Sequence, residues 1–430
     1  KGIVVTMITS ITGINWGDEG KGRMVDLLSE NYDIVVRYQG GNNAGHTVVN
    51  DKGKFILNLL PSGILRDNTV NVMGPGMVID VEHLYGEVEK LREAGINITP
   101  DNLKISDRAV ICMPYHKMLD CLEEDRLGDA KFGSTRRGIA PVYADRFMKK
   151  AFRMGELLHM DSVKLKMPGI LEWKNLTVEK GYGAEALKSE DMIAWLEKYG
   201  LAFKDYICDT TEYLTSEIKA GKSLMFEAQL GALRDIDFGI IPYTSSSYTI
   251  SAYAPIGAGI PSQKIDKAIG IMKAYSSCVG EGPFTCELFG DEAKALRDAG
   301  GEYGAATGRP RRVGGFDVPA SRYGIMMQGA DEIALTKLDV LSYADRIPVC
   351  VKYNINGILT DRFPMGDDLN CARPVYEYLD GWKCDITGCR SFSELPVNAQ
   401  KYIKYIEEKT ECNIKYVSVG AGRDEYFVMD

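Results

Sequence analysis

Short, mostly apolar runs recur along the chain, and longer segments with helical spacing separate them. The runs lie at residues 4–14, 34–36, 224–226, 333–335 and 416–419. Such runs are typical of strands that are buried on both faces of a sheet. Because these strands alternate with helices, the sequence predicts an α/β fold. Its core should be a large, mostly parallel central sheet, P-loop-like in type, with helices on both faces.

Helical spacing is clearest in two segments. Leu84, Val88 and Leu91 recur on one helical face, and residues 399–406 place apolar side chains on another. Residues 354–357 read Asn-Ile-Asn-Gly between two alternating strands. That pattern predicts a small antiparallel hairpin beside the parallel sheet.

Composition excludes several classes of protein. The chain has 430 residues and a net charge of -9, which argues against a general nucleic-acid binder. No apolar run reaches the length of about 18 residues that a membrane span needs. The ten cysteines include no CxxC pair, which favours free thiols in a reducing cytoplasm. The segment of about 102–220 is the least regular and is predicted to be a mainly helical insertion.

A glycine-rich segment follows the first apolar run, and residues 11–22 read ITGINWGDEGKG. Glycines let backbone N–H groups approach phosphate oxygens, and a helix that begins near Lys21 would direct its positive end toward the anion. Gly22 replaces the Ser or Thr that holds Mg²⁺ in a standard P-loop, so Asp18 is the nearest candidate ligand. The segment therefore predicts a variant phosphate-binding loop.

A second glycine cluster occupies residues 39–47, which read QGGNNAGHT. Asn and Gly tolerate unusual backbone angles and expose amide groups. His46, one of only four histidines, can donate to a developing negative charge or pass a proton. Taken alone, the cluster is more typical of a surface turn that carries a solvated histidine.

The two clusters together resemble the adenylosuccinate synthetase family. The resemblance implies that Asp18 is the catalytic base and a metal ligand, and that His46 is the general acid. It also implies that Gly45 gives the metal a backbone carbonyl and that Asn43 contacts the substrate nucleotide. GTP is the implied co-substrate, with one Mg²⁺ per subunit.

Further segments extend the resemblance to the substrate nucleotide. Residues 133–143 read GSTRRGIAPVY and are similar to the family's phosphate-binding segment GTT-x-x-GIGPAY, with Thr135 at the phosphate-binding threonine. Ser245 stands at another phosphate-contacting threonine position. Lys149 replaces an arginine that reaches into the neighbouring subunit's site. A homodimer is therefore implied.

One segment departs from the family pattern. Residues 226–239 read FEAQLGALRDIDFG, whereas the family pattern is FEGAQGTLLDIDxG. Gln229 therefore falls one place early, and Leu230 takes the glutamine position. A local backbone shift would be needed to restore Gln229. Val279 matches a ribose contact, and Cys278 before it occupies a usual arginine position.

The last motifs point to aspartate and to guanine. Residues 305–312 read AATGRPRR, and three arginines within four residues form a strong local anion site. Residues 336–339 read TKLD directly after an apolar strand. A carboxylate at this place, Asp339, can accept hydrogen bonds from both the ring N–H and the exocyclic amine of guanine, a pair that adenine lacks.

Carried over residue by residue, the resemblance implies three ligand sites and a metal site. For GTP it implies Gly17, Glu19, Gly20, Lys21, Gly22, Gly45, His46, Thr47, Arg311, Lys337, Asp339, Ser418 and Gly420. For IMP it implies Asp18, Asn43, Thr135, Lys149, Gln229, Leu230, Ser245, Val279 and Arg309. For aspartate it implies Thr307 and Arg309, and for the metal Asp18 and Gly45. Motifs near both ends must grip one GTP, so we expect a single domain over residues 1–430.

The implied reaction converts GTP, IMP and L-aspartate into GDP, phosphate and adenylosuccinate through 6-phosphoryl-IMP, in AMP biosynthesis. Two alternatives stay open. The departures at Lys149, Leu230, Cys278 and Cys286 are consistent with a related ligase for guanylate, a deoxynucleotide or another amino acid. A non-catalytic GTP-binding regulator would be the second alternative, although the intact Asp18 argues against it.

Overall fold

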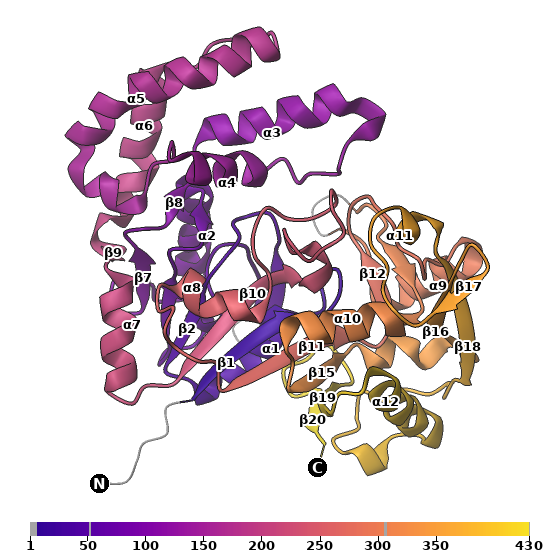
Figure 1. The fold of residues 1–430 in the computed structure, drawn as a ribbon. Coiled ribbons are helices and arrows are strands. Elements are labelled where there is room, and N and C mark those ends of the chain that lie inside the picture. Colours follow the sequence, from indigo (N-terminus) through magenta and orange to yellow (C-terminus); the bar gives the residue numbers. More distant parts are fainter. Residues whose placement is uncertain (1–6, 51–52, 305–307, 430) are drawn as a thin grey trace.

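A computed structural model describes residues 7–50, 53–304 and 308–429. Its centre is a ten-stranded sheet (Figure 1). The strand order is β20 (Tyr426–Val428), β19 (Ile414–Ser418), β15 (Glu332–Thr336), β11 (Lys267–Lys273), β1 (Ile8–Gly13), β10 (Leu224–Gly231), β2 (Ile34–Arg37), β5 (Val70–Met73), β7 (Leu103–Ser106) and β9 (Ile207–Cys208). Every neighbouring pair is parallel except β19 and β20. The predicted mostly parallel sheet is confirmed.

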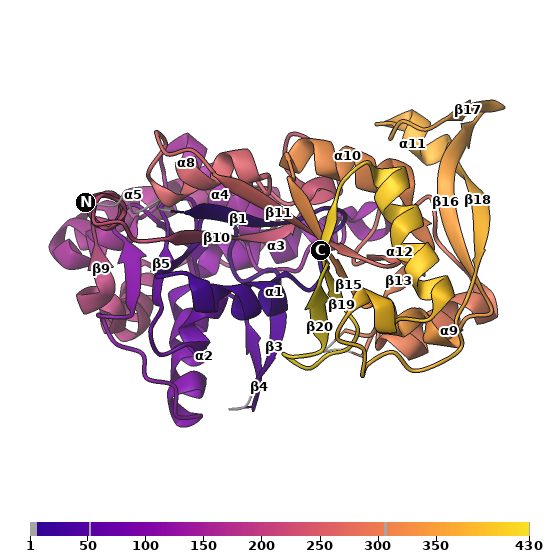
Figure 2. The same cartoon turned by 90° about the horizontal axis from the view of Figure 1, so that it is seen from below.

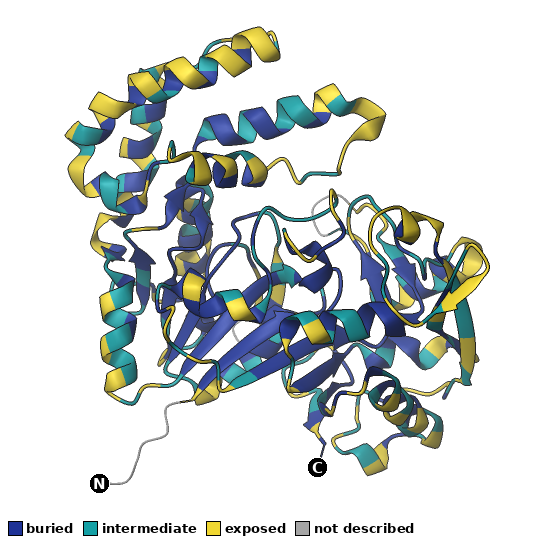
Figure 3. Cartoon of the chain, in the orientation of Figure 1, coloured by how far each residue is buried: buried dark blue, intermediate teal, exposed yellow. Residues whose placement is uncertain are grey.

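Both faces of this sheet are covered, as the alternation of strands and helices predicts. Figure 2 shows α1 (Lys21–Leu28), α2 (Val81–Glu93) and the hairpin of β3 (His46–Asn50) and β4 (Gly53–Leu57) on one side. It shows α8 (Ala254–Ala258) and α10 (Val318–Gln328) on the other side. The strands between them are almost entirely buried (Figure 3).

The least regular part of the sequence is mostly helical. It contains α3 (Pro114–Leu127), α4 (Ile139–Met148), α5 (Met160–Asn175), α6 (Ser189–Trp195) and α7 (Thr210–Lys219). The same segment also supplies β7 and β9, which form one edge of the central sheet. The helices α3 to α6 therefore extend from that edge (Figure 1).

A smaller sheet lies on the other side of the molecule from helices α3 to α6 (Figure 1). It joins β14 (Phe316–Asp317), β16 (Arg346–Ile355), β17 (Ile358–Thr360) and β18 (Arg373–Asp380), and β16 pairs with β17 and β18 in antiparallel fashion. The turn between β16 and β17 confirms the hairpin predicted from residues 354–357. The predicted helices are also confirmed as α2 and α12 (Val397–Thr410).

The remaining elements are short. They are β6 (Val78–Ile79), β8 (Val110–Ile111), β12 (Ser276–Cys278), β13 (Arg312–Gly314), α9 (Gly290–Gly300) and α11 (Asp367–Cys371), joined by several single turns of 3-10 or π helix. Among the residues described, no helix combines the length and apolar character that crossing a membrane requires.

Candidate active site

The residues predicted for the site gather beyond the carboxyl ends of the parallel strands. β1 leads into the glycine-rich loop, β2 into the second glycine cluster, and β15 into Lys337. β19 ends at Ser418, on the same edge of the sheet. In open α/β sheets this edge is where ligands bind, because the strand-to-helix loops converge there.

One carboxylate shapes the phosphate-binding loop. Glu19 accepts hydrogen bonds from the N–H groups of Asn15 at 3.1 Å and Gly17 at 2.7 Å. Its second oxygen binds the Lys21 ammonium at 2.6 Å, and both side chains are buried. Helix α1 begins at Lys21, as the sequence predicts, after Gly20 in the left-handed region. The loop therefore holds its cation in place at a helix N-terminus, where an anion is favoured.

His46 lies directly against this loop. A Cβ atom added to Gly22 would stand 2.2 Å from Cδ2 of His46, so the ring can approach only because position 22 is a glycine. Nε2 of His46 is 2.8 Å from the Ser62 hydroxyl and 3.4 Å from Oε1 of Glu227. Ser62 also donates to Glu227 at 2.8 Å. The imidazole is therefore oriented by a buried hydroxyl and a buried carboxyl group.

The electrostatic environment keeps His46 neutral in the free chain. Burial, together with the nearby Arg37 and Lys21 cations, lowers the pKa of His46 well below its ordinary value. Burial also raises the pKa of Glu227, although Arg37 opposes that shift. A neutral imidazole beside a phosphate loop can donate one hydrogen bond without bringing a full charge into the buried site.

Asp18 occupies an unusual backbone conformation at the loop tip, with φ of 65°. A non-glycine residue in this region is uncommon and is a feature of functional loops. Its Oδ2 makes an ion pair with Arg311 but no well-aligned hydrogen bond. Arg311 also contacts Oε2 of Glu302 at 3.0 Å. The proposed base is thus paired with a cation from a distant segment.

Glu302 is the centre of a buried charge cluster next to Asp18. Its carboxylate contacts Lys273 at 2.8 Å and Lys337 at 3.4 Å, besides Arg311. Although burial raises the pKa of Glu302, Lys273 and Lys337 outweigh it, and the net shift is downward. Burial lowers the pKa of Lys337. The ionised glutamate fixes three cations around the end of the phosphate loop.

Asp339 and Arg23 lie in the part of the site that is predicted to bind guanine. Burial raises the pKa of Asp339, and its Oδ1 is buried without a hydrogen-bond partner among the described residues. The Arg23 guanidinium donates to the Ser418 hydroxyl and to the carbonyl of Gly420. A buried acceptor without a donor is costly, so this oxygen points to a missing ligand.

At the departure from the family pattern, β10 contains a bulge. Residue Ile11 of β1 pairs with Glu227, but Gly13 pairs with Gly231, so β10 carries two extra residues. Leu230 in this bulge has φ of 64°. The Gln229 amide donates to the carbonyls of Gly41 at 2.8 Å and Ala44 at 3.0 Å. Gln229 therefore holds the second glycine cluster in place.

The loop that carries Thr135 is held from beneath by helix α3. Asp120 accepts hydrogen bonds from the Ser134 hydroxyl at 2.6 Å and from the Gly138 N–H at 2.8 Å. One turn later, Glu124 accepts the N–H groups of residues 132 and 133, each at 3.2 Å. Both carboxylates are buried, and Thr135 is exposed at the tip of the loop.

Comparison with known proteins decides which family this geometry belongs to. The family described as "Adenylosuccinate synthetase" matches residues 10–427. A relative named "Adenylosuccinate synthetase" from Halothermothrix orenii is 44% identical over 416 residues, which cover 96% of this chain and 97% of the relative. One of the same name from Brachyspira hyodysenteriae is 43% identical over 420 residues, 97% of this chain and 98% of that one. The chain belongs to the adenylosuccinate synthetase family.

Solved structures agree with this assignment. The "fully ligated Adenylosuccinate synthetase from Plasmodium falciparum" matches with a TM-score of 0.92 at 36% identity, covering 98% of this chain and 99% of that chain. A cyanophage succinoaminodeoxyadenylate synthetase matches with a TM-score of 0.62 at 18% identity and shares the fold alone. The chain is therefore a ligase that forms a C–N bond in purine biosynthesis, and the family uses GTP as a substrate.

Several other residues implied by the adenylosuccinate synthetase resemblance are exposed or lie outside the described residues. Thr307 lies outside the described residues, so its predicted contact with aspartate is not placed. Arg309 is exposed, with Glu281 at 3.7 Å. Thr47 and Lys149 are exposed as well.

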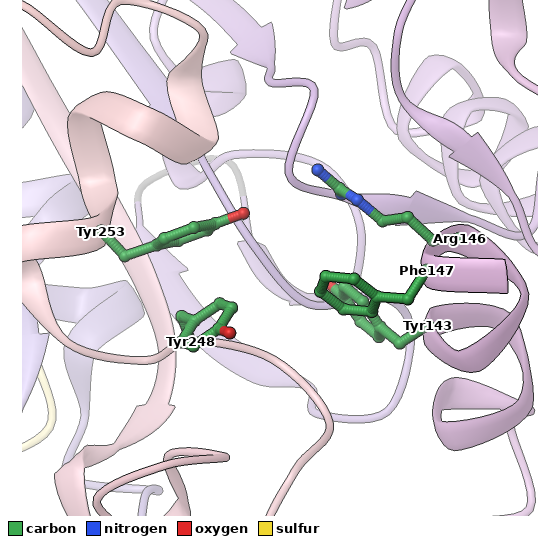
Figure 4. A pocket seen from close by; sticks show the side chains of 5 residues that line it. All are labelled: Tyr143, Arg146, Phe147, Tyr248 and Tyr253. Carbon is green, nitrogen blue, oxygen red and sulfur yellow. The ribbon is translucent and has the colours of Figure 1, made fainter. Parts of the chain in front are cut away.

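A cavity of about 150 Å³ lies between α4 and the segment after Ser245. Figure 4 shows Tyr248 and Tyr253 on one side facing Tyr143, Arg146 and Phe147 on the other. The Tyr143 hydroxyl accepts the Gly40 N–H at 2.9 Å and donates to the Gly76 carbonyl at 2.9 Å. None of the residues assigned to GTP lines this cavity, which lies beside the loops assigned to IMP.

The sequence motifs do not predict which residues hold the adenylosuccinate synthetase site in shape. Glu302 and Asp120 lie in segments with no recognisable pattern. Glu227 is part of the quoted FEAQLG motif and Arg23 directly follows the glycine loop, so both had a signal in their position. Their roles depend on contacts with distant residues, which the spacing of one motif does not contain.

Proposed function

We propose the following residue roles in the synthesis of adenylosuccinate from IMP, GTP and L-aspartate. Asp18 takes the N1 proton of IMP, which makes O6 nucleophilic, and O6 attacks the γ-phosphate of GTP. The bond from that phosphorus to the β–γ bridging oxygen breaks, and GDP leaves. The aspartate amine then displaces phosphate at C6 and loses a proton. The juxtaposition of Asp18, Lys21 and His46 around one helix N-terminus supports this proposal most directly.

Lys21 and the loop N–H groups stabilise the charge that develops on the transferring phosphoryl group. His46 donates from Nδ1 to the oxygen between the phosphoryl groups, and Ser62 and Glu227 keep its ring in this orientation. Because Ser62 donates its proton to Glu227, Nε2 donates to Ser62, and the ring has to take up a second proton as the triphosphate binds. Two of these groups are ion-paired in the free chain, Lys21 with Glu19 and Asp18 with Arg311. Because Arg311 occupies the Asp18 carboxylate, substrate binding has to draw Arg311 away before Asp18 can face N1 of IMP.

One Mg²⁺ per subunit is proposed to bind at Asp18 and Gly45. The described residues contain no group of three His, Cys, Asp or Glu side chains that could hold a metal by themselves. One carboxylate oxygen of Asp18 without an aligned hydrogen bond and the Gly45 carbonyl would leave the remaining positions to phosphate and water, which is how Mg²⁺ binds in nucleotide sites. The ion would neutralise charge on the β- and γ-phosphates.

At the base, Asp339 accepts the guanine N1–H and amine, and Lys337, Ser418 and Gly420 surround the ring. On the IMP side, Asn43, Thr135, Ser245 and Val279 contact the nucleotide. Thr307 and Arg309 bind the carboxylates of aspartate. The remaining residues implied for GTP and IMP act as part of the loops already described.

A homodimer is also proposed, with Lys149 reaching into the neighbouring site. Lys149 ends α4 in the left-handed conformation, and the preceding Phe147 and Met148 are 67% and 50% exposed. Adjacent exposed apolar side chains are a common feature of subunit interfaces. The free state of all ten cysteines supports a reducing cytoplasmic location. The chain is proposed to act as one domain over residues 1–430.

A turnover assay tests the proposal. The full chain is incubated with Mg²⁺, GTP and L-aspartate, and with IMP, guanylate or their deoxy forms, and the product mass is measured. Adenylosuccinate should form with IMP, and phosphate release should need both co-substrates. A higher kcat/KM with guanylate or a deoxynucleotide would support the related-ligase alternative, and phosphate release from GTP alone would contradict the mechanism.

A further inference from the structure

Arg234 is a buried cation without a carboxylate partner. It lies in the short turn that follows β10, and only 8% of it is exposed. Its guanidinium donates to the carbonyls of Tyr243 and of Val279, the latter at 2.7 Å, and to Sγ of Cys278 at 3.0 Å. Within the described ranges, no Asp or Glu lies at ion-pairing distance from it. A buried charge that is left unpaired is expensive, so this one needs an explanation.

The neighbouring arginines differ in this respect. Arg312 makes a forked contact with Glu287 at 2.9 Å, and Arg311 contacts Glu302 at 3.0 Å. Burial raises the pKa of the Cys278 thiol, although Arg234 opposes that shift, so the thiol is neutral and does not balance the charge. The positive charge of Arg234 is therefore available to an anion that binds nearby.

The contacts of Arg234 join the two segments proposed to hold IMP. Its own carbonyl accepts the Ser245 N–H at 2.8 Å, and its side chain holds the carbonyl of Val279. The two segments also touch directly, since a Cβ added to Gly282 would stand 2.6 Å from Cγ of Tyr243. One residue thus fixes the backbone on both sides of the proposed phosphate and ribose contacts.

The two residues in this contact, Arg234 and Cys278, both depart from the family pattern. The family motif FEGAQGTLLDIDxG has a leucine where this chain has Arg234, and Cys278 stands where an arginine is usual. In space the two positions are neighbours, because Nη2 of Arg234 lies against Sγ of Cys278. Cys278 is buried, with 1% exposed, so a guanidinium at position 278 would have to occupy the buried region where that of Arg234 now lies.

We infer that Arg234 is a positioning residue for IMP, whose guanidinium enters from β10 and replaces the one that relatives carry at position 278. It holds Ser245 and Val279 at a fixed separation and adds positive charge beside the nucleotide's phosphate. The inference rests on the proposed placement of IMP between these two residues. It also explains how the chain can carry cysteine at position 278 and still belong to the family.

Steady-state kinetics with the full chain test this inference. Arg234→Leu should raise the KM for IMP by about tenfold or more, because two charge-assisted hydrogen bonds and a cation are lost, and should change the KM for GTP less than twofold. Arg234→Lys should give an intermediate KM, since the charge stays but the forked geometry is lost. Arg126→Leu, at an exposed ion pair on α3, is the matched control and should leave both KM values unchanged.

Moving the guanidinium from position 234 to position 278 provides the decisive measurement. Cys278→Arg alone should also weaken IMP binding, because two guanidinium groups would compete for one buried volume. The double variant Arg234→Leu with Cys278→Arg should return the KM for IMP to within about threefold of the original value. The inference would be overturned if the increase in KM for IMP in the double variant equalled the product of the two single-variant increases. An unchanged KM for IMP in Arg234→Leu would overturn it as well.

Two outcomes separate this inference from the proposed function. Failure of the original chain to bind IMP would count against the proposed function itself. Normal IMP turnover in the original chain together with unaffected Arg234 variants would count against Arg234 alone. Thermal melting of each variant shows whether it has kept its fold. If Arg234→Leu has not, Arg234→Met replaces it, because Met keeps most of the side-chain volume, and the same KM for IMP is expected.

Discussion

The two halves of the proposed site are built in different ways. On the triphosphate side, defined by Asp18, Lys21, Glu302, Arg311 and Lys337, every cation is paired with a carboxylate of the same chain. Asp18 and Lys21 follow the carboxyl end of β1, Lys337 follows that of β15, and Glu302 is fully buried. The triphosphate side is therefore charged and already neutralised before any ligand arrives.

The monophosphate side is defined by Thr135, Lys149, Arg234 and Ser245, and its two cations have no such partners among the described residues. Lys149 is exposed, and Arg234 donates to backbone carbonyls and a thiol. The carboxylate Asp120 there binds loop N–H and hydroxyl groups instead of cations. The shape of the loops, more than pairing of charges, defines this side.

This difference predicts different kinetic consequences. Where a cation must leave a carboxylate before chemistry begins, a substitution changes the charges present during the reaction and mainly lowers kcat. Where a carboxylate holds a loop that contacts only the substrate's phosphate, a substitution changes substrate affinity and mainly raises KM. Variants on the two sides should therefore separate in kcat and KM.

The largest effect is expected on the triphosphate side, from Asp18→Asn. Turnover should fall by at least about 10³-fold, because the amide cannot accept the N1 proton of IMP. GTP affinity, measured by calorimetry, should change little, since Lys21 and the loop N–H groups remain. Asp298→Asn, an exposed aspartate on α9, is the control. Turnover like that of the original chain would remove Asp18 from its proposed role.

A smaller effect is expected at the base, where Asp339 carries an unpartnered buried oxygen. Asp339→Asn should lower kcat/KM for GTP by about 100-fold, because an amide N–H₂ would face the guanine amine. The same variant should gain activity with xanthosine triphosphate, whose base presents a carbonyl at that position. Parallel assays with both triphosphates measure the ratio, and an unchanged ratio would show that Asp339 does not read the base.

On the monophosphate side, Asp120→Ala should raise the KM for IMP by about tenfold and leave kcat and the KM for GTP within twofold. The substitution removes the acceptor for the Ser134 hydroxyl and the Gly138 N–H, so the loop of Thr135 loses its fixed shape. Glu123→Ala, on the same helix but in an exposed ion pair with Arg126, is the matched control. A fall in kcat at constant KM would place this loop in the chemical step.

The sequence predicted the fold well because its signals are local. Apolar runs marked β2, β10, β15 and β19, and the glycine loop marked the start of α1 at Lys21. It did not show that the segment of about 102–220 also supplies the last two strands at one edge of the sheet, β7 and β9, since their pairing depends on partners elsewhere in the sequence.

The sequence predicted the motifs of the candidate site, but not the residues that hold its loops in place. Asp18 and His46 stand in two dense glycine clusters, and it is the two together that carry the family resemblance. Gln229 shows the limit, because its neighbour Leu230 suggested a lost substrate contact. Only the bulge in β10 shows that the Gln229 amide binds the loop of residues 41–44. Such contacts join segments nearly 200 positions apart, beyond the reach of motif spacing.

The smallest effect concerns stability and lies outside both halves of the site, at His116. Its Nε2 is 2.8 Å from Asp145, and Lys174 binds the same carboxylate. Burial lowers the pKa of His116, although Asp145 opposes that shift, so the folded chain keeps the ring neutral. In the unfolded chain the ring takes up a proton near its ordinary pKa of about 6.5.

It follows that His116 destabilises the fold only as pH falls below about 6.5, by at most about 1.4 kcal/mol per pH unit, until the folded-state pKa is reached. The measurement is the thermal midpoint at pH 7.5, 6.5 and 5.5. His116→Gln should flatten the fall between the last two points, whatever its midpoint at pH 7.5, whereas His159→Gln, at an exposed histidine, should not. An equal slope in both variants would mean that the folded chain protonates His116, with Asp145 and not burial controlling the ring.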